Sequence, residues 1–119
     1  MNVTHVGLPV RDAERSVAFY ASHFGFDPAT ATTHDDGTVI VRNRDAFDLA
    51  LHPDAGVAAP LHPFLHVGFR LTDADAVRAV LADLRAAGAE IVEEWDEPGY
   101  VALKCADPDG HRVEVYWEP

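Results

Sequence analysis

The chain has 119 residues, of which 48 % are hydrophobic, and this length suits one sizeable core rather than two independent domains. Its 20 acidic residues against 9 basic ones give a formal net charge of −11, which argues against nucleic acid and anionic membrane as partners. Cys105 is the only cysteine, so an internal disulfide and a zinc site built from thiolates are excluded, and any metal must use nitrogen and oxygen ligands.

The first half of the chain predicts a strand, a helix and three further strands. Residues 4–10 form a short apolar strand, and a helix is expected between Asp12, a typical N-cap, and Gly25, a typical residue just beyond a helix end. Turn residues then separate the strand-like runs at residues 29–34, 38–43 and 46–52.

The second half repeats this order after a connection over residues 53–63 that is rich in proline and alanine. An apolar strand covers residues 65–71, and a helix is expected between Thr72, predicted to be its N-cap, and Gly88. Three more strand-like runs follow at residues 90–95, 100–106 and 111–117.

The repeated order indicates an internal duplication. When the two halves are overlaid, His5 to Gly7 falls on His66 to Gly68, and Asp48 falls on Glu114. We therefore predict an α+β fold in which one domain over residues 1–119 is built from two βαβββ modules. The modules are expected at about residues 1–54 and 64–119.

Four polar residues recur at equivalent places in the two predicted modules. His5 and His66 are each the strong ligand type in an otherwise apolar first strand, whereas Asp48 and Glu114 lie on the minority polar face of the last strand. An approximate twofold axis would bring these residues together, and a divalent cation would satisfy two imidazoles and two carboxylates that are costly to bury unpaired. The donor set suits iron(II), manganese, nickel, cobalt or zinc.

Other residues are candidates for the wall of the same cleft. His52 shares a strand face with Asp48, and Tyr116 shares a face with Glu114. Phe69 and Tyr100 are predicted to line the substrate pocket as well, with core packing as the alternative for both.

Three stretches of the sequence carry a resemblance to a known superfamily: residues 5–26, residues 66–69 and residues 107–117, which read DPDGHRVEVYW. They resemble the vicinal oxygen chelate superfamily, which includes glyoxalase I, extradiol ring-cleavage dioxygenases, methylmalonyl-CoA epimerase, fosfomycin resistance proteins and bleomycin-binding proteins. The resemblance implies paired βαβββ modules that form a curved mixed sheet around a metal cleft. By motif, the metal ligands would be His5, His66 and Glu114, with Asp48 at the variable fourth place.

The ligand set favours an enzyme, although three functions stay open. The leading one is a glyoxalase-like lyase or isomerase, in which a divalent metal acts as a Lewis acid and Glu114 or Asp48 moves a proton. An extradiol-type dioxygenase using iron is the first alternative, because two histidines and one carboxylate leave three positions open on an octahedral ion. A metal-free drug-binding protein of the bleomycin-binding type is the second.

The sequence also predicts the setting in which the protein works. Few basic residues are available for an anionic substrate, since Lys104 is the only lysine. The amino terminus lacks the features of a signal peptide, and no segment approaches the roughly 18 apolar residues of a membrane span, so we expect a cytoplasmic protein. Its expected partners are a small-molecule substrate or drug and, in a homodimer, a second copy of the chain.

Overall fold

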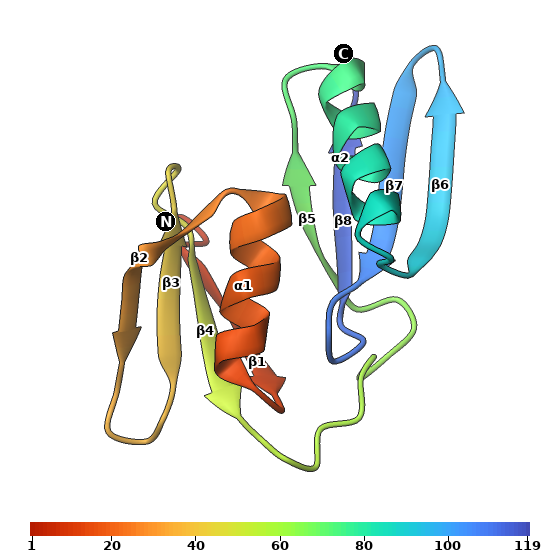
Figure 1. Ribbon diagram of the computed structural model, residues 1–119. Helices are drawn as coiled ribbons and strands as arrows, with labels where there is room; N and C mark the ends of the chain where they lie inside the picture. The colour runs from red at the N-terminus through yellow and green to blue at the C-terminus, as the bar shows by residue number, and fades with distance from the viewer. The chain divides into compact units, whose positions relative to one another are not determined.

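The computed structural model describes all of residues 1–119, and the chain divides into two compact units at residues 1–57 and 58–119. We call them the first and the second unit. Each contains one four-stranded mixed sheet and one helix, in the order strand, helix and three strands (Figure 1). The predicted α+β fold of two βαβββ modules is therefore confirmed.

The first unit begins its helix where the sequence predicts. The Asp12 carboxylate accepts a hydrogen bond from the Arg15 backbone N–H, and Gly25 ends the helix in the left-handed conformation, at φ 73°. Strand β1 runs parallel to β4, and the sheet order is β1-β4-β3-β2. The elements are β1 (His5–Val10), α1 (Ala13–Phe24), β2 (Phe26–Thr33), β3 (Val39–Asn43) and β4 (Asp48–Pro53).

The second unit repeats this topology with the sheet order β5-β8-β7-β6. Its helix starts one residue later than predicted, because Asp73 rather than Thr72 is the N-cap and accepts a hydrogen bond from the Ala76 backbone N–H. Neither helix of the chain is long and apolar enough to span a membrane. The elements are β5 (His66–Arg70), α2 (Ala74–Ala86), β6 (Ile91–Glu97), β7 (Tyr100–Ala106) and β8 (Arg112–Trp117).

One face of each sheet packs against the helix of its own unit and forms the core. Alternation along β8 directs Val113 and Val115, each 1 % exposed, toward this core and directs Glu114 the other way. We call the opposite side of each sheet its far face. The buried apolar residues include Tyr20, Val41, Leu49 and Leu51 in the first unit and Val77, Leu84 and Leu103 in the second.

The turn before β8 fixes where that strand starts. The Asp107 carboxylate accepts hydrogen bonds from the backbone N–H groups of Asp109 and His111, both at 2.9 Å. Gly110 has φ 99°, and a Cβ at this residue would lie 2.7 Å from the Ala59 carbonyl oxygen. Glycine is therefore required here on both conformational and steric grounds, and the turn holds β8 in its register.

Candidate metal centre

The far face of the second unit brings two predicted ligands into contact. His66 lies on β5 and Glu114 on the neighbouring β8, and Nε2 of His66 lies 3.1 Å from Oε2 of Glu114. Gly68 is the register partner of Glu114, and a Cβ on it would come within 3.3 Å of Oε2. The glycine therefore leaves the room that the carboxylate occupies beside the imidazole.

A backbone carbonyl defines the tautomer of His66. The Nδ1 atom of the ring lies 2.6 Å from the carbonyl oxygen of Phe64, and since a carbonyl can only accept, Nδ1 must carry the hydrogen. In the neutral imidazole, Nε2 then presents a lone pair toward the Glu114 carboxylate. Two acceptors at 3.1 Å repel each other unless a proton or a metal ion lies between them.

This arrangement fits a metal ion. Two ligands at right angles on one ion, each about 2.1 Å from it, lie about 3 Å apart, close to the separation of His66 and Glu114. Metal-binding histidines commonly donate their other ring N–H to a carbonyl, as His66 does to Phe64. The donor chemistry and the tautomer therefore both suit a divalent cation.

Tyr100 orients the Glu114 carboxylate. Its hydroxyl donates a hydrogen bond of 3.2 Å to Oε1 of Glu114, which leaves Oε2 facing His66. Burial, and then the nearby Glu114 charge, raise the pKa of Tyr100, so the hydroxyl keeps the proton that it donates. Tyr100 was predicted to line the pocket, and the structure places it in direct contact with a candidate ligand.

We expect Tyr100→Phe to weaken metal binding about tenfold, because hydrogen-bond partners behind a ligand typically contribute 10–100-fold to affinity. The dissociation constant of cobalt(II), followed by its visible absorption, measures the effect. Tyr116→Phe is the matched control, since Tyr116 lies on the same far face and makes no hydrogen bond to Glu114. Equal effects of the two substitutions would contradict the orienting role.

The far face of the first unit carries the other two predicted ligands. His5 and Asp48 are register partners on the parallel strands β1 and β4. Asp48 is already held by Arg42, whose Nε and Nη2 donate hydrogen bonds of 2.8 and 2.9 Å to the two carboxylate oxygens. These bonds lower the pKa of Asp48, so its carboxylate stays ionised and paired.

The strand register shows that the predicted equivalence of Asp48 and Glu114 is wrong. In the second unit His66 pairs with Arg112 and Gly68 with Glu114, whereas in the first unit His5 pairs with Asp48 and Gly7 with Ala50. Ala50 is therefore the residue that corresponds to Glu114. The overlay was shifted by two residues, an error that strand alternation cannot reveal because it keeps every side chain on the same face.

The predicted pocket residues divide between the two sides of the sheets. Tyr116 lies on the far face near Glu114, and a Cβ on Gly68 would be 3.9 Å from its ring. His52 lies on the far face of the first unit and hydrogen-bonds Thr38 through Nδ1 at 2.8 Å. The prediction for Phe69 is wrong, because Phe69 pairs with the buried Val115 and so points to the helix side.

One residue that lies beside a proposed metal ligand on the far face was not predicted from the sequence. Lys104 pairs with Glu114 across the antiparallel strands β7 and β8, so the two side chains share a face, and Lys104 is only 8 % exposed. The sequence alone does not single out Lys104, since a lysine in the run ALKCA is typical of a strand with one solvated face.

Neither unit by itself contains a group of three or more histidine, cysteine, aspartate or glutamate residues that could hold a metal ion.

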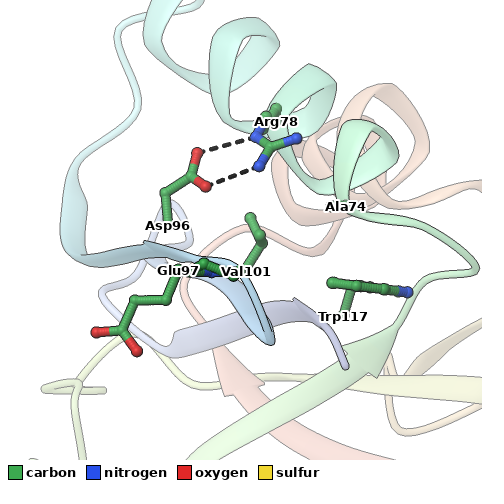
Figure 2. Close-up of a pocket in the computed structure, with 7 residues that line it drawn as sticks. Ala74, Arg78, Asp96, Glu97, Val101 and Trp117 are labelled. Atoms are coloured by element: carbon green, nitrogen blue, oxygen red, sulfur yellow. Dashed lines mark hydrogen bonds and ion pairs between the residues drawn. The ribbon is translucent and has the colours of Figure 1, made fainter. Parts of the chain in front are cut away.

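The pocket of about 400 Å³ in Figure 2 lies on the helix side of the second sheet. Arg78 of α2 and Trp117 of β8 line it, and Arg78 donates hydrogen bonds to Asp96 and to Asp75. Its guanidinium is thus occupied by two carboxylates. Because Trp117 and Glu114 lie on opposite faces of β8, this pocket does not belong to the candidate metal centre.

Comparisons with known proteins agree with the fold. The family model described as the Glyoxalase/Bleomycin resistance protein/Dioxygenase superfamily matches residues 2–115. A possible glyoxalase from Bacillus cereus is 23 % identical, with 97 % of each chain covered and a TM-score of 0.79. The fosfomycin resistance protein FosX from Listeria monocytogenes is 16 % identical, with 100 % of this chain and 94 % of that chain covered and a TM-score of 0.82.

A third solved structure is similar over the same extent. The glyoxalase/bleomycin resistance protein/dioxygenase domain from Frankia sp. EAN1pec is 20 % identical, with 100 % of this chain and 98 % of that chain covered and a TM-score of 0.82. No curated protein matches the chain in sequence.

Proposed function

Because the chain belongs to the glyoxalase, bleomycin resistance protein and dioxygenase superfamily, we propose that it is a metal-dependent enzyme of the glyoxalase type, a lyase or isomerase. Its substrate would be a small molecule that chelates a divalent metal through two neighbouring oxygens. The observation that carries this proposal is the contact of 3.1 Å between Nε2 of His66 and Oε2 of Glu114, which brings an imidazole and a carboxylate together as donors for one cation.

From the superfamily resemblance we propose His5, His66 and Glu114 as the metal ligands, of which His66 and Glu114 lie in contact within the second unit. This set of two imidazoles and one carboxylate suits iron, manganese, nickel, cobalt or zinc and leaves positions free for a chelating substrate. A FosX structure is described as a complex with manganese(II), which supports a divalent ion in this fold. Asp48 is left out because both of its oxygens are bound by Arg42.

The side chains around the centre have distinct roles in this proposal. When bound, the metal would supply a Lewis acid that polarises a substrate oxygen. Tyr100 holds the Glu114 carboxylate in place, and Glu114 is the group that we propose to take and return a proton. Asp48, the other predicted catalytic carboxylate, is a weaker base because Arg42 lowers its pKa.

We expect Asp48→Asn to bind cobalt(II) with the affinity of the wild type, since the substitution removes a carboxylate that is paired with Arg42 rather than available to a metal. Titration of the full chain, followed by visible absorption, measures the affinity. Its counterpart is Glu114→Gln, which removes a proposed ligand by the same kind of change. A loss in Asp48→Asn as large as that in Glu114→Gln would restore the four-ligand set.

An extradiol-type ring-cleavage dioxygenase is the second candidate, and the Arg42–Asp48 ion pair favours it by leaving only three protein ligands. Two probes separate the candidates. The lyase or isomerase should exchange carbon-bound hydrogen of hydroxyacetone with deuterated water, whereas an iron-loaded dioxygenase should consume oxygen when given catechol. Tight drug binding by protein that takes up no metal would instead indicate the bleomycin-binding type.

The assembly of two copies of the chain into a homodimer stays a prediction.

A further inference from the structure

We propose that Gly68 is a positioning residue for the metal ligand Glu114. Because Gly68 has no side chain, the Glu114 carboxylate can lie against the backbone of β5 with its Oε2 atom beside His66. This inference rests on the proposed function, since it concerns a neighbour of a proposed ligand. It goes beyond that function by assigning a role in metal binding to a residue that supplies no ligand itself.

The backbone conformation of Gly68 does not explain why this residue is a glycine. The glycines of the chain that adopt a positive φ are Gly25, Gly37, Gly88 and Gly110. Gly68 is the middle residue of β5 and has an extended conformation that every residue type can adopt. A glycine inside a strand weakens the strand, because it loses more conformational entropy on folding and has no side chain to pack. The reason for Gly68 must therefore lie in its surroundings.

The surroundings of Gly68 leave little room for a side chain. A Cβ at this residue would lie 3.3 Å from Oε2 of Glu114 and 3.9 Å from Cε1 of Tyr116. The second separation is an ordinary van der Waals contact, whereas the first is tighter than one. A methyl group at residue 68 would therefore displace the carboxylate by a few tenths of an ångström.

The Glu114 carboxylate cannot make this movement without changing its other contacts. Its Oε2 lies 3.1 Å from Nε2 of His66, and its Oε1 accepts the hydrogen bond of 3.2 Å from the Tyr100 hydroxyl. A metal ion holds its ligands to within about 0.2 Å of the preferred distance. A displacement of a few tenths of an ångström is therefore large enough to weaken the binding of a metal by Glu114 and His66.

The first unit contains a glycine at the same place without the carboxylate. Gly7 lies two residues after His5 on β1, as Gly68 lies two residues after His66 on β5, and its register partner is Ala50. A Cβ at Gly7 would have the Ala50 carbonyl oxygen as its nearest atom, at 4.0 Å, which is an ordinary contact. Gly7→Ala is therefore the matched control for Gly68→Ala.

The competing role for Gly68 is a structural one in β5. The two roles predict different effects on the metal-free protein. If only the carboxylate needs the space, Gly68→Ala should leave the free energy of unfolding unchanged or raise it, because alanine loses less conformational entropy on folding than glycine. If the strand itself needs the glycine, the substitution should lower the free energy of unfolding.

The experiment is a double-mutant cycle on the full chain. The dissociation constant of cobalt(II) is measured by visible absorption in the wild type, Gly68→Ala, Glu114→Gln, the double variant of these two substitutions, and Gly7→Ala. Urea unfolding of each metal-free protein, followed by circular dichroism, gives the stability. The cycle shows whether residue 68 acts through Glu114, because substitutions that act through the same contact do not add.

We expect Gly68→Ala to weaken cobalt(II) binding about tenfold, as the disturbance of a ligand by its neighbour implies, without lowering the stability of the metal-free protein. In the Glu114→Gln background the same substitution should change the affinity less than about twofold, and Gly7→Ala should bind cobalt(II) as the wild type does.

Three results would overturn the inference alone: an undiminished affinity in Gly68→Ala, an equal loss in the Glu114→Gln background or in Gly7→Ala, and a metal-free Gly68→Ala that is unfolded or less stable than the wild type. A wild type that binds no cobalt(II) would overturn the proposed function and this inference together.

Discussion

The Glu114→Gln variant should bind a divalent metal more than about 100-fold more weakly than the wild type, a larger loss than that expected for an outer hydrogen-bond partner. The amide is nearly the same size as the carboxylate but carries no charge and is a poor ligand for these ions. In the native chain Oε2 of Glu114 lies 3.1 Å from Nε2 of His66, so the substitution removes the acidic half of this pair. Competition with a chelator of known affinity measures the loss.

Glu14→Gln is the matched control for this experiment, because Glu14 is an exposed residue of the first turn of α1 and belongs to no candidate site. It should bind metal as the wild type does. The free energy of unfolding of metal-free Glu114→Gln should also be close to that of the metal-free wild type, which would show that the effect lies in the ligand. Undiminished metal affinity in Glu114→Gln would remove this residue from the set.

The Leu103→Ala variant should lower the free energy of unfolding by about 2–5 kcal/mol. Leu103 is 1 % exposed on the central strand β7, opposite Val115 of β8 and facing α2, so its loss leaves a cavity between the sheet and the helix. Urea unfolding followed by circular dichroism measures the change. Leu61→Ala is the matched control, since Leu61 is 57 % exposed and should alter stability by less than about 0.5 kcal/mol. A loss as large in Leu61→Ala would contradict this location of the core.

Much of the fold could be predicted from the sequence because the decisive signals are local. Asp12 and Gly25 mark the ends of α1 within one segment, and the alternation of Val113, Glu114 and Val115 defines the two faces of β8. The repeat of His-Val-Gly at residues 5–7 and 66–68 indicates the internal duplication, and each copy does begin the first strand of a unit. Each of these features depends on neighbours in the chain.

The parts of the site that could not be predicted depend on pairing between strands. Nothing local in β4 shows that Asp48 lies opposite Arg42 of β3, which binds both of its oxygens. Nothing local distinguishes Asp48 from Ala50 as the counterpart of Glu114, because a shift of two residues preserves the face. Nothing local in β7 shows that the Lys104 ammonium lies 5.8 Å from the ring centroid of Phe64, a residue 40 positions away along the chain.

The metal content of the purified full chain tests the central claim most directly. The chain, prepared without an affinity tag and incubated in turn with iron, manganese, nickel, cobalt and zinc, should retain a divalent ion in close to stoichiometric amount, and the His66→Ala variant should lose it. This result would support the metal-dependent enzyme. A wild type that stays empty with all five metals, or a His66→Ala variant that keeps the ion, would contradict the account.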